Sequence, residues 1–263
     1  MKLTKTLTIV LGILLLGASS AFDADAKVTR KSGRAKTRTT ATAALTVKKG
    51  AVKNYADGLQ TQEFSIKRGK SDILVEYPIA GNTQLVSAMR NWIKDMVCEN
   101  YTGSLDTPDA MMTKAIKAVE RGETLNEEVK VSYINDKVIT VQLQSYLYMG
   151  GAHGMPGDVS RTFLLSNGTA LTNEMLPSDS QLRSLIASGL CQYFEVANTS
   201  ELADCMMCPV NELTKGVPYI TDKGLVFKYG PYEIAPYAAG MPEAVIPVNK
   251  IKPLLGSTAA KFF

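Results

Sequence analysis

The chain has 263 residues, an ordinary content of charged and aromatic residues, and a formal net charge of +4. This length suits one sizeable domain or two small ones, and nothing in the composition indicates a transmembrane bundle, a coiled coil or a repeat array. The charge is unevenly divided, because residues 27–56 contain nine Lys or Arg and no Asp or Glu, whereas residues 57–263 contain 18 basic and 23 acidic residues. A basic segment is therefore joined to a mildly acidic body.

Residues 1–26 have the pattern of a secretory signal peptide. Two lysines precede an apolar run over residues 7–16, which is too short for a stable membrane span, and the small residues at 24–26 suit cleavage. No cysteine lies near this site, which argues against a lipoprotein anchor. The alternative is an uncleaved N-terminal anchor. We expect an exported protein, located in the periplasm or outside the cell.

The segment 27–58 is rich in Thr, Ala, Lys and Arg and has no apolar periodicity, so it is predicted to be a disordered basic linker. Two roles remain open for it. It is either a solvated linker or an electrostatic contact to anionic lipid or wall polymer. Nucleic acid is not expected as a partner of an exported chain.

Apolar periodicity predicts the elements of the body in chain order. Alternation with a period of two predicts strands over 63–67, 72–77, 128–134, 137–148, 159–165, 219–221, 225–229, 232–234 and 244–247. Apolar residues three and four apart predict helices over 83–96, 108–121, 178–194, 201–207 and 249–255. The strands come in pairs rather than in a strict β-α-β alternation. The predicted fold class is therefore α+β, with mostly antiparallel sheets and packed helices in two intertwined subdomains, 59–157 and 158–263.

A glycine-rich stretch lies between two of the longest predicted strands. Residues 150–157 contain four glycines and His153, the only histidine of the chain. A histidine can act as a base or bind a ligand, but its ring nitrogens can equally hydrogen-bond the backbone of its own loop. The chain has no Gly-x-Ser-x-Gly motif, and one histidine cannot form a zinc site of protein nitrogens. No catalytic residue, metal or cofactor is predicted.

Four cysteines lie in the part of the chain expected to be exported: Cys98, Cys191, Cys205 and Cys208. An oxidising compartment favours disulfides, although zinc binding and free thiols remain alternatives. Cys205 and Cys208 have the spacing of a redox motif, but they follow a predicted helix rather than a strand. Cys98 lies off the apolar stripe of its helix. We therefore expect at least one disulfide, involving the segment of Cys205 and Cys208.

Tyrosines gather near the glycine-rich stretch and near a second loop further along the chain. Tyr146 and Tyr148 lead into the first, and Tyr229, Tyr232 and Tyr237 surround the second. Tyrosine suits interfaces and sugar faces because it combines an apolar ring with a polar tip, although it is also common at the edge of a core. The predicted binding residues are Tyr148, His153, Tyr229, Tyr232 and Tyr237.

Three parts of the sequence together resemble one family. They are residues 148–154 (Tyr-Met-Gly-Gly-Ala-His-Gly), 163–171, and 225–240, which ends in Glu-Ile-Ala-Pro-Tyr-Ala-Ala-Gly and is followed by Val-Ile-Pro at 245–247. They resemble the domain of unknown function 3298, associated with family 4163 in the N-terminal half, and the similarity covers about residues 60–255.

The resemblance implies an extracytoplasmic α+β module. One member is the sensor domain of the lysozyme-binding anti-sigma factor RsiV, and another accompanies a peptidoglycan deacetylase domain. This chain shows neither a sigma-binding domain nor the metal-binding residues of a deacetylase. Binding is therefore the only function that the resemblance transfers.

The sequence predicts a secreted or periplasmic envelope protein that binds and does not catalyse. Its expected partner is a basic envelope-directed protein such as lysozyme, or a peptidoglycan glycan. The acidic body would attract a basic partner at long range. One alternative is a peptidoglycan-modifying enzyme, which would need two carboxylates facing each other across a cleft. The other is a structural partner of envelope proteins.

Overall fold

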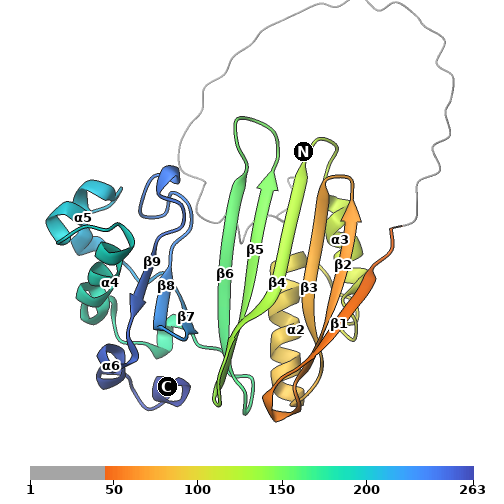
Figure 1. Ribbon diagram of the computed structural model, residues 1–263, viewed down its shortest axis with the longest axis horizontal. Helices are drawn as coiled ribbons and strands as arrows, with labels where there is room; N and C mark the ends of the chain where they lie inside the picture. The colour runs from red at the N-terminus through yellow and green to blue at the C-terminus, as the bar shows by residue number, and fades with distance from the viewer. Residues whose placement is uncertain (1–44) are drawn as a thin grey trace, which may run out of the picture.

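The computed structural model describes residues 45–263 and folds them into two β-sheets with their own helices (Figure 1). The strands of the first sheet are β1 (Lys48–Asn54), β2 (Gln60–Arg68), β3 (Ser71–Ala80), β4 (Thr124–Ile134), β5 (Val138–Tyr148) and β6 (Met155–Leu164), which lie side by side in this order. The strands of the second sheet are β7 (Val217–Thr221), β8 (Gly224–Lys228) and β9 (Glu243–Ile246). The helices are α2 (Thr83–Cys98), α3 (Asp109–Ala118), α4 (Asp179–Tyr193), α5 (Thr199–Cys205) and α6 (Val248–Ile251).

The predicted α+β class is confirmed. Every strand pair is antiparallel except β3 with β4, which are parallel. A parallel pair needs a long crossover, and α2 and α3 supply it between these two strands. No helix within residues 45–263 is long and apolar enough to span a bilayer.

The first core lies between the six-stranded sheet and the helices α2 and α3. In β3 the alternating residues Ile73, Val75 and Tyr77 are fully buried, and they pack with Met89 and Ile93 of α2. The strands predicted at 63–67 and 72–77 are confirmed and form the hairpin of β2 and β3, and the helix predicted after them is confirmed as α2. Asn82 caps α2 by accepting hydrogen bonds from the backbone N–H groups of the first helical turn.

The second core lies between α4 and the three-stranded sheet. Gly189 of α4 permits this contact, because a Cβ at this position would lie 2.9 Å from Cα of Ala244 in β9. α4 begins with a capping box, in which the Ser178 N–H donates to Oε1 of Gln181 over 3.1 Å. Val138 and Leu164, which belong to strands of the first sheet, pack into this second core.

Three predictions need correction. The segment 27–58 is not wholly disordered, because β1 lies within it; this edge strand is exposed along its whole length and so carries no apolar alternation to reveal it. The predicted boundary at 157/158 cuts through β6, which pairs with β5 along its whole length. The predicted strand at 232–234 is a turn. The signal segment 1–26 and residues 27–44 lie outside the described residues.

Buried hydroxyl groups join the two sheets. The Thr140 hydroxyl of β5 donates to the backbone oxygen of Ile220 in β7 over 2.7 Å, and the Ile220 N–H donates to the Thr162 hydroxyl of β6 over 2.8 Å. The two hydroxyl oxygens are 2.8 Å apart. Since a hydroxyl has one proton and that of Thr140 is used on Ile220, Thr162 donates to Thr140. Nearby, Nζ of Lys228 in β8 lies 2.7 Å from Oδ2 of Asp158 in β6.

A buried carboxylate fixes β1 to the sheet. Glu76 in β3 is 3% exposed and accepts hydrogen bonds from the Tyr55 hydroxyl (2.5 Å), the Thr61 hydroxyl (2.8 Å) and the Lys53 ammonium (3.0 Å). The N–H of Val131 in β4 adds a fourth donor at 3.3 Å. Burial by itself would raise the pKa of Glu76, but these hydrogen bonds outweigh it and hold the pKa below its ordinary value of 4.5.

We predict that Glu76→Gln lowers the free energy of unfolding by ~3 kcal/mol at neutral pH, because it leaves the Lys53 ammonium and two hydroxyls without their charged acceptor. A lowered folded-state pKa stabilises above 4.5 and loses that stabilisation as the pH falls through the folded value. The difference between wild type and variant should therefore shrink below about pH 4.5 in urea unfolding. The control is Glu63→Gln, which removes the more exposed partner of Lys53 and should cost under ~1 kcal/mol. Equal effects of the two variants would contradict this role of Glu76.

A second carboxyl group faces the first core without a partner. Glu127 shares a face of β4 with Leu125, Val129 and Val131, which pack against α2 and α3. Its Oε2 atom is buried and has no hydrogen-bond partner among the described residues. Burial raises the pKa of Glu127 to about 8, so this carboxyl group is neutral at pH 7.

We predict that Glu127→Gln makes the free energy of unfolding less dependent on pH between pH 5 and pH 8. A folded-state pKa raised to about 8 stabilises below the ordinary value of 4.5, and this contribution is lost as the pH rises from 4.5 to about 8. Wild type should therefore lose roughly 2–4 kcal/mol relative to the glutamine variant between pH 5 and pH 8. Urea unfolding at several pH values measures the difference. A constant difference across this range would show that Glu127 does not titrate in the fold.

Candidate functional site

Two loops from the two subdomains meet in an aromatic cluster, which we define as His153, Tyr232 and Tyr237. The His153 and Tyr237 rings are stacked, with centroids 4.3 Å apart and planes inclined by 30°. The Tyr232 ring lies 5.6 Å from that of Tyr237. Tyr232 is 38% exposed and His153 is exposed, whereas Tyr237 is half-buried between them. The cluster therefore offers aromatic edges and faces to solvent.

The backbone of Gly154 holds the cluster together. Its carbonyl oxygen accepts from the Tyr237 hydroxyl over 2.9 Å and lies 3.1 Å from Nδ1 of His153. Because a carbonyl oxygen can only accept, Nδ1 of His153 is the donor in this hydrogen bond. The Gly154 N–H donates to the Tyr146 hydroxyl over 3.2 Å. Of the roles left open for His153, the hydrogen bond to the backbone of its own loop is present, and one face of its ring stacks on Tyr237.

The second loop is supported from several sides. A turn of 3-10 helix, η4 (Tyr237–Ala239), ends with a carbonyl of Ala239 that accepts from the Tyr193 hydroxyl of α4 over 2.8 Å. The Glu233 carboxylate accepts from the Gly230 N–H over 2.7 Å. Tyr232 has a φ of 63°, in the left-handed region. A residue with this φ cannot continue an extended strand, so the strand predicted at 232–234 is replaced by a turn.

The structure brings together three of the five predicted binding residues. Tyr148 lies close by in sequence, but its hydroxyl donates to the Gly151 carbonyl over 3.0 Å and so closes its own loop. Tyr229 is 1% exposed and its hydroxyl donates to the Thr214 carbonyl over 2.7 Å, so it is a core residue and cannot contact a ligand. Tyr146 was not among the predicted binding residues, although it is 40% exposed and bonds Gly154. Its position two residues before Tyr148, on the same face of the strand, could have indicated it.

Two carboxylates converge from distant positions on a single ammonium group. Nζ of Lys228 lies 2.7 Å from Oδ2 of Asp158 and 3.4 Å from Oε2 of Glu243. The Gln142 amide also donates to Asp158, and the Tyr219 hydroxyl donates to Glu243. Both carboxylates are thus engaged by partners of the fold. Through Lys228 of β8, the two carboxylates link β6 to β9.

All four cysteines are free thiols in the structure. The expected disulfide at Cys205 and Cys208 is therefore not formed in it. Cys98, which lies off the predicted apolar stripe of its helix, is nevertheless buried: 6% of it is exposed, and it belongs to the first core. Burial raises the pKa values of Cys98, Cys191 and Cys208, which makes these thiols poor nucleophiles. Residues 45–263 contain no group of three His, Cys, Asp or Glu placed to hold a metal ion.

Comparison with known proteins shows a similarity that covers part of this site. Residues 215–249, which include Tyr232 and Tyr237, match the family model described as a protein of unknown function (DUF3298). A search of curated proteins gave no match. The remaining similarity is structural.

Two solved structures of DUF3298 proteins share the fold. One, from Bacteroides fragilis, aligns with a TM-score of 0.62 at 17% identity and covers 83% of this chain and 96% of its own. The other, from Pseudomonas aeruginosa, aligns with a TM-score of 0.54 at 20% identity and covers 84% of this chain and 97% of its own. The described fold is therefore that of proteins in this family along nearly their whole length.

We predict that Gly154→Ala disrupts the cluster. An added Cβ would lie 2.5 Å from Cζ of Tyr146 and 2.8 Å from the backbone oxygen of Leu147, and backbone cannot give way. Overpacking of this kind costs ~1–3 kcal/mol. The comparison variant is His153→Asn, which leaves Gly154 unchanged and should change the free energy of unfolding by less than ~1 kcal/mol. Thermal unfolding of both variants measures this; a larger loss for His153→Asn would make the histidine the structural centre of the loop.

Proposed function

We propose that this chain is an exported, non-catalytic binding protein of the cell envelope, and that its aromatic cluster binds the glycan of peptidoglycan. The observation that carries the proposal is the stack of His153 and Tyr237 beside Tyr232, three rings contributed by two subdomains and open to solvent. Ring faces with polar tips suit the apolar faces and hydroxyl edges of sugars. The signal-like segment 1–26 supports export.

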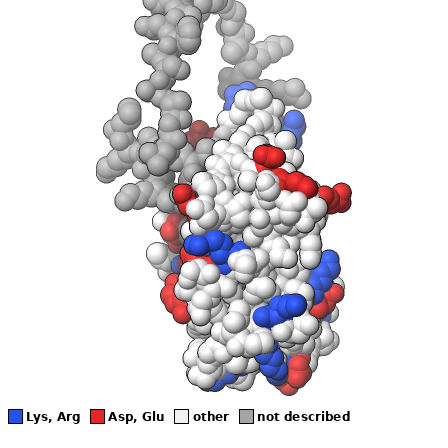
Figure 2. All heavy atoms as spheres, turned by 90° about the vertical axis from the view of Figure 1, so that its left-hand side faces the viewer, with Lys and Arg blue, Asp and Glu red and all other residues white. Residues whose placement is uncertain are grey.

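A basic partner protein such as lysozyme is the second candidate. The resemblance to the RsiV sensor domain and to family 4163 supports it, and so does the excess of five acidic residues in 57–263. On the face formed by the helices of the second subdomain, a short row of acidic side chains lies in the upper part, and charges of both signs are scattered below it over a largely uncharged surface (Figure 2). Steering of a basic partner would rest mainly on the modest overall charge of the body. The glycan is therefore the preferred ligand.

The enzyme alternative finds less support. A glycosidase needs two carboxylates facing a substrate, whereas Asp158 and Glu243 face the same ammonium group of Lys228. His153 has no hydroxyl or thiol nucleophile bonded to it among the described residues. A purely structural partner would not require exposed, stacked rings at the junction of the subdomains. Binding of a sugar accounts for the exposed, stacked rings.

We predict that Tyr237→Ala and Tyr232→Asn each weaken binding of muropeptides by ~1–3 kcal/mol, because each removes an aromatic anchor. Asparagine is chosen at position 232 because it tolerates the positive φ found there. Tyr237→Phe keeps the ring but removes the hydrogen bond to Gly154, so it should lose less affinity than Tyr237→Ala. Isothermal titration calorimetry of the purified protein with muropeptides, and with lysozyme in parallel, measures the effect.

The matched control is Tyr101→Ala, which removes a tyrosine that packs against the first core on the helix side of the sheet. It should leave muropeptide affinity within about twofold, as expected for a residue outside the interface. Binding of lysozyme alone, lost in the same variants, would favour the second candidate. If the wild-type protein binds neither muropeptides nor lysozyme, the proposal is wrong and the structural-partner alternative replaces it.

A further inference from the structure

We propose that a basic groove at the edge of the first sheet, distinct from the aromatic cluster, binds the phosphate groups of a linear anionic polymer. The groove has a volume of about 510 Å³ and is formed where the chain before β1 runs along the end of β2. Its lining comes from two segments, residues 45–48 and the end of β2 with its turn: Leu45, Thr46, Lys48, Ser65, Lys67, Arg68 and Gly69. No carboxylate lines it.

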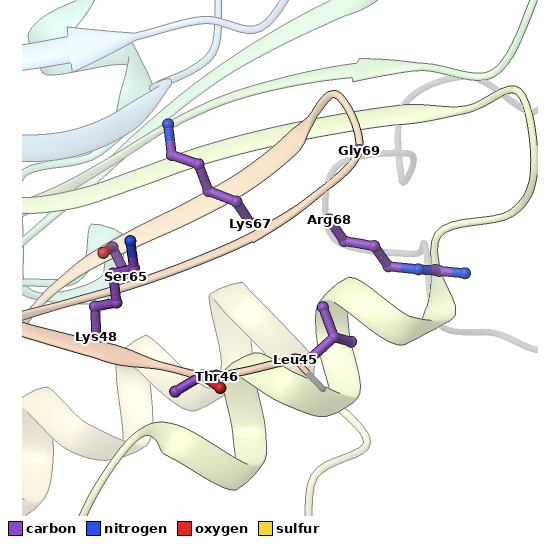
Figure 3. A pocket seen from close by; sticks show the side chains of 7 residues that line it. All are labelled: Leu45, Thr46, Lys48, Ser65, Lys67, Arg68 and Gly69. Atoms are coloured by element: carbon purple, nitrogen blue, oxygen red, sulfur yellow. The ribbon is translucent and has the colours of Figure 1, made fainter. Parts of the chain in front are cut away.

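Two ammonium groups and one hydroxyl share a side of this groove. Lys48 is the cross-strand partner of Ser65, and Lys67 follows Ser65 by two residues, so the three side chains project from the same face of the sheet. Figure 3 shows Lys48, Ser65 and Lys67 on one side of the strands, with Arg68 turned away. Two cations and a hydroxyl donor are the groups that a phosphate oxygen requires.

The charges of these lysines are not neutralised by the fold. Among the described residues, neither Lys48 nor Lys67 forms an ion pair, although Asp72 lies across from Lys67 in the β2–β3 register. Arg68 is different, because its guanidinium donates to the carbonyls of Ile116 and Val119 at the end of α3. Arg68 thus fixes the hairpin to the helix, and the lysines remain available for an external anion.

The start of β1 is held on the sheet by strand pairing and packing. Lys48 pairs with Ser65 and Lys49 with Phe64, and Leu45 and Val47 pack against the first core. The ammonium of Lys49 lies 5.8 Å from the centroid of the Phe64 ring, on the other face of the sheet. A preformed site of this kind binds without first having to order its own backbone.

The sequence favours a polymer over a single phosphate. The 18 residues that precede the groove, 27–44, contain six Lys or Arg and no acidic residue. A linear polymer that occupies the groove at one phosphate can meet these further cations at others, so that several counterions are released on binding. A single orthophosphate would use only the groove. The occupant is therefore a chain of phosphates or phosphodiesters.

The test measures binding of fluorescent long-chain polyphosphate to the full-length protein by anisotropy at ~50 and ~200 mM salt. Lys48→Gln combined with Lys67→Gln should weaken binding roughly tenfold at the lower salt, since each exposed charge pair is worth up to about 1 kcal/mol. The matched control is Lys223→Gln with Lys252→Gln, two exposed lysines of the second subdomain, which removes the same charge elsewhere. It should change affinity by less than about twofold. Thermal unfolding checks that both double variants fold.

Equal losses in the two double variants would overturn the proposal, because net charge alone would then explain binding. Orthophosphate that displaces polyphosphate equally well at matched phosphate concentration would also overturn it, in favour of a free-phosphate site. Binding to phosphatidylglycerol vesicles that depends on Lys48 and Lys67, without polyphosphate binding, would assign the groove to a lipid surface instead. Both double variants should bind muropeptides with the affinity of the wild type. A negative result for the groove therefore leaves the proposed glycan site untouched, and a negative result for the glycan site leaves the groove untouched.

Discussion

The hydrogen-bonded junction of Thr140, Thr162 and Ile220 is the constraint on which the arrangement of the two sheets depends. Each hydroxyl proton and each lone pair that faces the junction has a partner, and all of these groups are buried. Moving one sheet relative to the other would leave several polar groups unpaired away from water, which costs far more than each bond contributes when formed. The adjacent ion pair of Lys228 with Asp158 restricts the same displacement. The junction thus fixes relative position more than it adds stability.

The aromatic cluster is a consequence of that fixed position. Its histidine comes from the loop between two strands of the first sheet, and its tyrosines come from the loop between β8 and β9 of the second. The hydrogen bond from Tyr237 to Gly154 joins the loops directly. The family model covers only the second of them. A fragment containing that half alone would carry two rings of the cluster without the histidine against which Tyr237 stacks.

The basic groove and the aromatic cluster lie in different parts of the molecule. The basic residues of the N-terminal part lead into β1, whose position is set by the carboxylate of Glu76, while the aromatic cluster lies at the junction of the subdomains. Glu76 is ionised because four donors surround it, whereas Glu127, on the opposite face of the same sheet, lacks a partner for Oε2 and stays neutral. The contributions of these two glutamates to stability therefore change with pH in opposite directions: that of Glu76 is lost as the pH falls and that of Glu127 as the pH rises.

The sequence by itself determined the α+β class, the long hairpins and the helices, because amphipathic periodicity and caps are local properties. It also pointed to His153 and Tyr237, since an unusual loop composition is visible without coordinates. It could not reveal β1, an exposed edge strand stabilised by its pairing and by distant Glu76. It misjudged Tyr229, because burial is set by neighbours remote in sequence. Only the tertiary structure decided which residues meet, since the stack of His153 on Tyr237 joins residues 84 positions apart through a junction that no local pattern records.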